Sequence, residues 1–247
     1  MKALAQAELT LLSRNKAALF AALALPATMT FSMKSPIEEL DLKSTGLTVG
    51  TVLLPGAIGF VLLFAVYTNL VGVFVARREE LVLKRLRCGE LSDRQILAGT
   101  ALPAVVVALA QCALLAVAGG LVLDLEAPKA PHLAVVGVLL GLALMVAMAA
   151  VTAGVTKSTE GAQLSPMPLM LISLMGSGMV FPLDVMPDRL AAVCEVLPLT
   201  PAIELVRAGW TGGDGVGDTL TQLVTGVAWI AAAVWSVRRW FRWEPRR

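Results

Sequence analysis

The stretch that decides the fold runs from residue 50 to residue 76 and reads GTVLLPGAIGFVLLFAVYTNLVGVFVA. It contains no acidic or basic side chain and no histidine. A helix of roughly 20 apolar residues crosses the hydrocarbon core of a bilayer, so this run is long enough to span it. Arg77 and Arg78 follow at once. The sequence therefore predicts a transmembrane helix with a basic segment at its end.

Five more runs share this composition and lie at residues 17–33, 96–123, 133–156, 164–181 and 220–237. The whole chain is 57% hydrophobic and only 15% charged, whereas a typical soluble domain has about 25% charged residues. We therefore expect an all-α membrane protein with six transmembrane helices. Residues 1–247 form a single transmembrane domain in this prediction, because no segment has the composition of a sizeable soluble module.

The basic residues fall on alternate sides of the six runs in unequal numbers. Of the 20 lysines and arginines, fifteen lie on one side and five on the other. Cytoplasmic segments retain Lys and Arg, so we expect both termini to face the cytoplasm and the chain to cross the inner (cytoplasmic) membrane several times. Because these residues adjoin membrane spans and lack a stacking platform, they indicate orientation in the bilayer and no nucleic-acid partner.

Two segments outside the runs are amphipathic. Residues 2–16 place apolar side chains at intervals of three to four, which suits either a helix lying on the cytoplasmic surface or an extension of the first span. Between the fifth and sixth runs, prolines that include Pro187 and Pro198 separate two short helical pieces, 188–196 and 202–210. This segment is too apolar for a solvated loop and too broken for a span. We predict a re-entrant or outer-interface helical hairpin.

Two spacings predict specific contacts of helices. Glu204 and Arg207 are three residues apart, so they share one helical face and can pair. The pair suits either a functional role in the hairpin or an exposed ion pair that contributes about 0 to 1 kcal/mol. Gly137 and Gly141 form a small-xxx-small spacing, which permits close contact between helices.

Residues suited to catalysis are scarce. The single histidine, His132, has no cysteine or carboxylate pair at metal-ligand spacing. No Gly-Lys dipeptide occurs, which excludes the GxxxxGK[ST] phosphate-binding loop. The conspicuous polar residues inside the runs are Tyr67, Thr68, Asn69 and Gln111, which suit interhelical hydrogen bonds or a pathway. We expect no catalytic residue, metal or bound cofactor in this chain, and an energy source on another protein.

The longest internal loop on the basic side, residues 77–95, reads RREELVLKRLRCGELSDRQ. Leu83 and Leu86 lie three apart on one helical face. Burying a leucine contributes about 1.5 to 3 kcal/mol. These side chains therefore require cover, either from a cytoplasmic partner or from the inner surface of this protein.

These features together resemble the membrane subunit of an ABC-2 type ABC transporter, a class of drug and polysaccharide exporters. The resemblance covers essentially the whole chain and rests on the six spans, the amphipathic N-terminal segment, the loop after the second span and the Pro-bounded hairpin. The residues that carry it are Arg78, Glu79, Leu83, Lys84, Arg85, Leu86 and Arg87 in the loop, and Pro187, Pro198, Glu204 and Arg207 in the hairpin. The loop departs from the family's usual form at Leu81, where Gly is common, and at Glu90, where Pro is frequent.

The resemblance implies an exporter permease that forms the pathway as a homodimer or with a related permease. It also implies a separate nucleotide-binding ATPase subunit, which binds the ATP and Mg and docks at the loop. An apolar pathway without fixed charge suits a lipophilic or amphipathic compound such as a drug or antibiotic. The alternative function is a membrane-embedded lipid-modifying enzyme or a passive membrane assembly factor. A neighbouring gene for a P-loop ATPase would favour the transporter.

Overall fold

The computed structural model describes residues 28, 32, 37, 47–82, 92–122, 125–213 and 215–241. The regular elements in these ranges are all helices. Three predicted features fall outside the described residues. They are the amphipathic segment 2–16, nearly all of the first span at 17–33, and the loop residues 83–91.

Four long helices form the body of the described chain. The first is one continuous rod made of α4 (Val49–Phe60), η2 (Val61–Thr68) and α5 (Asn69–Glu79). The others are α7 (Asp93–Val122), α8 (Pro131–Val155) and α13 (Val216–Trp240). Each of the four is long and apolar enough to cross a membrane. They coincide with the second, third, fourth and sixth predicted runs, so the prediction of these helices is confirmed.

Local sequence explains where the first rod begins and how it is built. Thr48 Oγ1 accepts a hydrogen bond from the Thr51 backbone N–H at 3.3 Å, and Thr51 Oγ1 accepts one from the Thr48 N–H at 2.9 Å. This reciprocal cap satisfies two backbone donors that a helix N-terminus leaves without partners. Further along, η2 is a π-helix, a rare wider form that is enriched at functional sites. Its residues Leu62, Leu63 and Tyr67 are fully buried in the core.

The fifth run does not form one continuous long helix. Its first residue, Leu164, is the last residue of α9 (Gly161–Leu164), and α10 (Met167–Gly176) follows after a turn at Ser165 and Pro166. The helix ends at Gly176, short of the predicted end at residue 181, because Gly178 adopts a left-handed φ of 69° that helical backbone does not use. The arrangement with six spans therefore stays a prediction.

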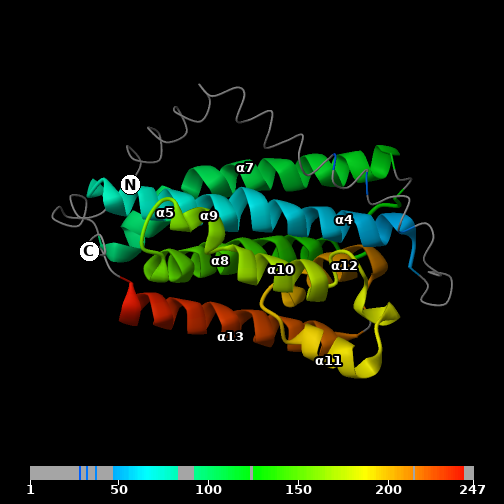
Figure 1. The fold of residues 1–247 in the computed structure, drawn as a ribbon. Helices are drawn as coiled ribbons and strands as arrows, with labels where there is room; N and C mark the ends of the chain where they lie inside the picture. The colour runs from blue at the N-terminus through cyan, green and yellow to red at the C-terminus, as the bar shows by residue number, and fades with distance from the viewer. Residues whose placement is uncertain are drawn as a thin grey trace.

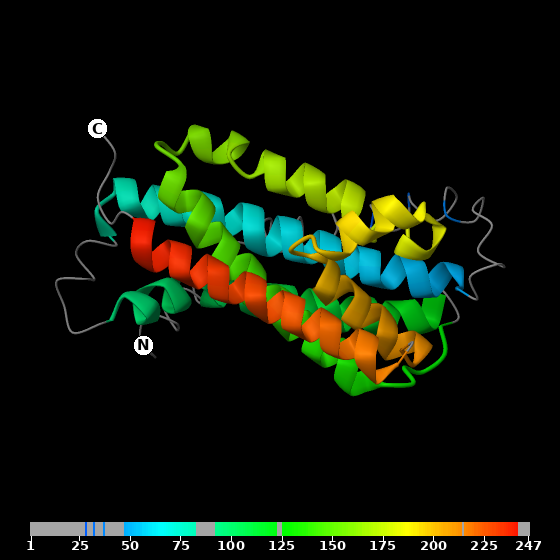
Figure 2. The same ribbon diagram turned by 90° about the horizontal axis from the view of Figure 1, so that it is seen from below.

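The long helices run lengthwise beside one another, as Figures 1 and 2 show. The ends of α5, α8 and α13 gather at one end of the bundle, while α11, α12 and the start of α4 lie at the other (Figure 1). We call the first of these the basic end, since Arg77, Arg78, Lys157, Arg238 and Arg239 lie at these helix ends. The opposite end is called the hairpin end. Which end faces the cytoplasm stays a prediction.

At the hairpin end, η3 (Leu183–Val185) is followed by α11 (Asp188–Glu195) and α12 (Thr200–Thr211). The two short helices form where the prolines predict them. α12 packs against α8, α4 and α13, and most of its residues are buried. In α11 only Cys194 is buried. α12 therefore belongs to the interior of the bundle and α11 to its surface, and the depth of both in the bilayer stays a prediction.

Candidate functional site

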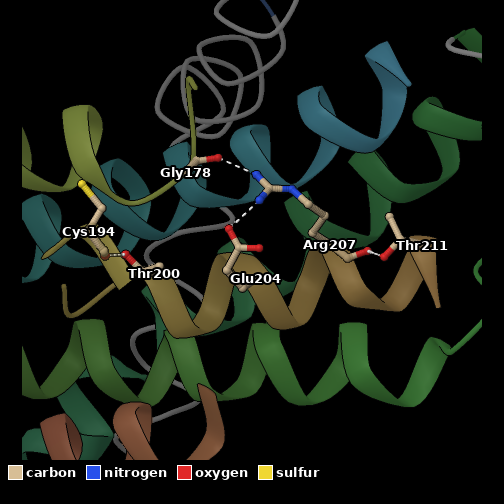
Figure 3. A network of polar contacts seen from close by, with 6 residues as sticks. All are labelled: Gly178, Cys194, Thr200, Glu204, Arg207 and Thr211. Carbon is tan, nitrogen blue, oxygen red and sulfur yellow. Dashed lines mark hydrogen bonds and ion pairs between the residues drawn. The ribbon is translucent and has the colours of Figure 1, made fainter. Parts of the chain in front are cut away.

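Hydrogen bonds from side chains to backbone carbonyls hold the turn between α11 and α12. Pro187 immediately precedes α11, and Pro198 is buried in the turn between the two helices. Thr200 Oγ1, at the start of α12, donates a hydrogen bond to the Cys194 carbonyl at 2.6 Å (Figure 3). The indole Nε1 of Trp229 on α13 donates to the Val196 carbonyl at 2.8 Å. The turn is therefore fixed both to its own helices and to α13.

Glycines let α12 approach α8 at backbone distance. A Cβ atom on Gly137 would lie 2.8 Å from both the Ala202 carbonyl oxygen and the Val206 nitrogen. On the other helix, a Cβ on Gly209 would lie 2.5 Å from the Ala134 Cβ. Both distances are shorter than carbon atoms tolerate, so larger residues cannot occupy these positions without moving a helix. The small-xxx-small spacing thus serves a contact inside this chain.

Arg207 is the centre of a buried polar network on α12 (Figure 3). Its Nη1 donates to Glu204 Oε1 at 2.5 Å, and its Nη2 donates to the Gly178 carbonyl at 2.6 Å. The Arg207 side chain is 4% exposed and that of Glu204 20% exposed. The pairing predicted from the sequence is confirmed, and its exposed version is wrong, because the guanidinium is buried among α12, α4 and the segment after α10. A buried charge requires such partners, since an uncompensated one costs several kcal/mol.

Gly178 joins α12 to the segment that follows α10. Its φ of 69° is the left-handed conformation that glycine adopts most readily, and a Cβ there would lie 2.9 Å from Glu204 Oε1. The next residue, Met179, lies against α4, where a Cβ on Gly56 would lie 2.3 Å from the Met179 carbonyl oxygen. Residues 177–180 are therefore held between α4 and α12. Sequence reasoning missed this contact of Gly178, although a Gly-Ser-Gly tripeptide at the end of an apolar run was its visible signal.

A cavity of about 250 Å³ opens beside this network. Its wall includes Asp184, Glu204, Arg207, Asp218 and Gln222. The Nε of Arg207 and the Oε1 of Gln222 are buried there without a hydrogen-bond partner among the described residues. Within the described ranges, no three His, Cys, Asp or Glu residues are placed to hold a metal ion. The cavity is thus a small polar space of mixed charge at the hairpin end.

At the basic end, Arg78 is fully buried and holds the C-terminus of α8. Its Nη1 donates to the Ala153 carbonyl at 2.7 Å, and its Nη2 donates to the Thr156 carbonyl at 2.5 Å. The last carbonyls of a helix have no intrahelical partner and carry partial negative charge, so a guanidinium there is favourable. Glu79 Oε1 accepts from the Thr159 N–H at 3.2 Å, just beyond the helix. The two residues connect α5 to the turn after α8, a contact that sequence reasoning missed.

The predicted loop and pathway residues are placed only in part. Lys84, Arg85, Leu86, Arg87 and Leu83 lie outside the described residues, which leaves Arg78 and Glu79 as the described part of the loop.

The predicted polar residues of the spans do not share one environment. Tyr67 is buried, and its hydroxyl lies 3.0 Å from Thr152 Oγ1 on α8, which matches the interhelical role. Gln111 is buried on α7, whereas Asn69 is exposed, and its side-chain amide donates to the Ala65 carbonyl in the preceding η2. A shared pathway of these three residues stays a prediction.

Comparison with known proteins bears directly on identity. Residues 1–210 match the family model of the ABC-2 type transporter membrane domain. No curated protein gives a match to the sequence. The family is a transmembrane permease domain without ATPase motifs, and its members generally pair with an ATP-binding subunit. Since the match covers most of the chain and the described helices include four apolar rods of spanning length, this multi-pass membrane protein belongs to the ABC-2 type transporter family.

Proposed function

We propose that the chain is the permease of an ATP-driven exporter, in which two permease chains form the pathway and a separate ATPase subunit supplies the energy. The family match over residues 1–210 is the observation that carries this proposal. ATP and Mg belong to the partner subunit, and this chain binds no cofactor of its own. The membrane is the inner (cytoplasmic) membrane, with the basic end on the cytoplasmic side.

The ATPase docks on the loop that follows α5, through Leu83 and Leu86. Two facts support this location. α5 ends at Glu79 at the basic end, so the loop emerges there. Leu81, just after α5, is 38% exposed, so the chain lies at the surface of the described bundle at this point. Two leucines on one helical face can anchor a partner, since each contributes about 1.5 to 3 kcal/mol when buried.

Co-purification with the ATPase encoded nearby tests the docking site. We expect Leu83→Asp with Leu86→Asp to abolish co-purification and transport, because two charges cannot be buried in an apolar interface. Membrane abundance and melting should stay at the wild-type level. Leu81→Asp is the matched control in the same segment and should keep the ATPase. A double variant that still binds its ATPase would place the docking surface elsewhere, and one that loses abundance would show that these leucines pack against this chain.

Single-cysteine labelling tests the orientation and the sixth span together. In a background without the native cysteines, cysteines at Pro128 and Gly213 should react with an impermeant reagent added outside intact cells. Cysteines at Glu90 and Glu244 should react only after the membrane is opened, because the positive-inside rule places them in the cytoplasm. The opposite pattern would reverse every assignment of function to a side.

The cargo class follows from the same reading. The described helices carry few charged side chains between their ends, so we propose a lipophilic or amphipathic compound such as a drug or antibiotic as the exported substance. Purified permease with its ATPase should show compound-stimulated ATP hydrolysis for such molecules and none for small inorganic ions. Stimulation by ions alone would contradict the proposed cargo class.

Cross-linking of the permease tests the proposed pair of chains. Recovery of monomers alone would contradict it.

A further inference from the structure

A groove of about 470 Å³ lies at the basic end between α7, α8 and α13. Its floor is α8, where Ala143 and Ala147 present small side chains. Leu97 of α7 forms one wall and Val234 of α13 the other, both at least partly exposed. The walls are apolar, and the charged residues of the lining, Asp93 and Arg238, belong to the first turn of α7 and the last turn of α13.

The groove reaches a depth that matches one leaflet of a bilayer. Its lining on α13 extends from Arg238 back to Ile230, which at the helical rise corresponds to about 12 Å. Half of a hydrocarbon core is about 15 Å thick. Since α7, α8 and α13 are all candidate membrane spans, the apolar part of the groove runs from an interface towards the middle of the membrane. Its natural occupant is a chain of methylenes that lies along the helices.

The charge at the mouth selects a headgroup. Asp93 already has a polar contact within the chain, and an acid in the first turn of a helix is favoured by the helix dipole. Arg238 is exposed and makes no hydrogen bond or ion pair with the residues that the structure describes. A guanidinium beside an apolar groove at the end of transmembrane helices complements a lipid phosphate.

We propose that this groove binds one phospholipid, with an acyl chain along α8 and its phosphate on Arg238. The groove shares no lining residue with the cavity beside Arg207. The lipid site rests on the groove and on Arg238 alone, so it holds whether or not the protein proves to be an exporter. Binding of the lipid fills the groove between α7 and α13, and it therefore holds these helices together at the basic end.

Native mass spectrometry of the full-length chain in detergent, titrated with palmitoyl-oleoyl phosphatidylglycerol, tests the headgroup. We expect Arg238→Gln to weaken the tightest lipid-binding step about fivefold, since a cation near the membrane surface contributes about 1 kcal/mol to anionic lipid binding. Arg239→Gln is the matched control, because Arg239 is the next residue and does not line the groove. It should bind like the wild type. Diacylglycerol with the same chains should bind more weakly to the wild type than phosphatidylglycerol does.

Filling the groove tests the acyl chain. Ala143→Phe places a ring on the exposed floor and should abolish the tight binding step, whereas Ala113→Phe, on an exposed position of α7 outside the groove, should leave it unchanged. Equal losses for Arg238→Gln and Arg239→Gln would show general surface attraction and overturn the proposal. Full lipid binding by Ala143→Phe would also overturn the proposal. If this variant kept its lipid but lost its ATPase or its dimer, another protein surface would occupy the groove, and the proposal would again be overturned. Should Ala143→Phe fail to fold, the two arginine variants decide alone.

Discussion

Arg78 should contribute strongly to the stability of the fold, and Arg78→Ala measures by how much. The guanidinium is fully buried and donates at 2.7 Å and 2.5 Å to two carbonyls at the end of α8. Hydrogen bonds to a charged group contribute about 1.5 to 3 kcal/mol each, and this includes the helix-dipole effect, which reaches about 2 kcal/mol when partly buried. The loss from the two bonds should therefore be about 3 to 6 kcal/mol. In a chain of this size that lowers the melting temperature by about 6 to 24 °C.

Thermal melting of the purified chain in detergent is the assay, and Arg77→Ala is the matched control. Arg77 is the adjacent residue, only partly buried, with a contact to Thr100 Oγ1 at 3.5 Å. Both variants remove one positive charge from the same segment, so effects on membrane orientation cancel. The Arg77 variant should melt within about 3 °C of the wild type. If Arg78→Ala melts like the control and yet loses its ATPase, Arg78 belongs to the partner surface and the capping role is refuted.

Three further substitutions have defined outcomes. Leu81→Gly should raise the melting temperature by about 2 °C. Leu81 has a left-handed φ of 59° that costs about 1 to 2 kcal/mol, and glycine removes this strain but loses about 0.5 to 1 kcal/mol more conformational entropy on folding. A lower melting temperature would contradict the strain. Gly178→Ala should cost about 2 kcal/mol by denaturation, since its Cβ meets Glu204 and its φ of 69° is unfavourable for alanine; a wild-type midpoint would show that the segment relaxes freely. Glu204→Gln should reduce transport at unchanged membrane abundance, because Arg207 loses its charged partner; unaltered transport would leave the pair a purely structural contact.

The four long helices could be predicted because composition alone determines them. A run without charged residues must leave water and satisfy its own backbone hydrogen bonds, and a helix does both. The second run, predicted at 50–76, is helical over 49–79. The fifth run, at 164–181, has the same composition but ends as a helix at Gly176. At this point the Gly178 carbonyl accepts a hydrogen bond from Arg207 of α12, a tertiary contact that no local pattern reports.

The contacts of the site that follow from residue spacing could be predicted from the sequence, whereas those that depend on burial could not. Glu204 and Arg207 pair because a helix brings residues three apart to one face. The burial of Arg78 was not visible, because the positive-inside rule already explains every arginine beside a span. The same rule explains Arg238 from the sequence alone. Its position at the mouth of the groove is visible only when the packing of α7 and α8 beside α13 is known.

The helix α8 is held at both of its ends by different parts of the chain. At the basic end Arg78 donates hydrogen bonds to its final carbonyls. At the hairpin end the backbone of α12 packs directly against Gly137. A helix of 25 residues is about 37 Å long, so a tilt of about 5° about one end displaces the other by about 3 Å. A rigid tilt of α8 imposed at the basic end, where Arg78 is bonded to its last carbonyls, would therefore shift its contact with α12, the helix that carries Arg207, by about 3 Å.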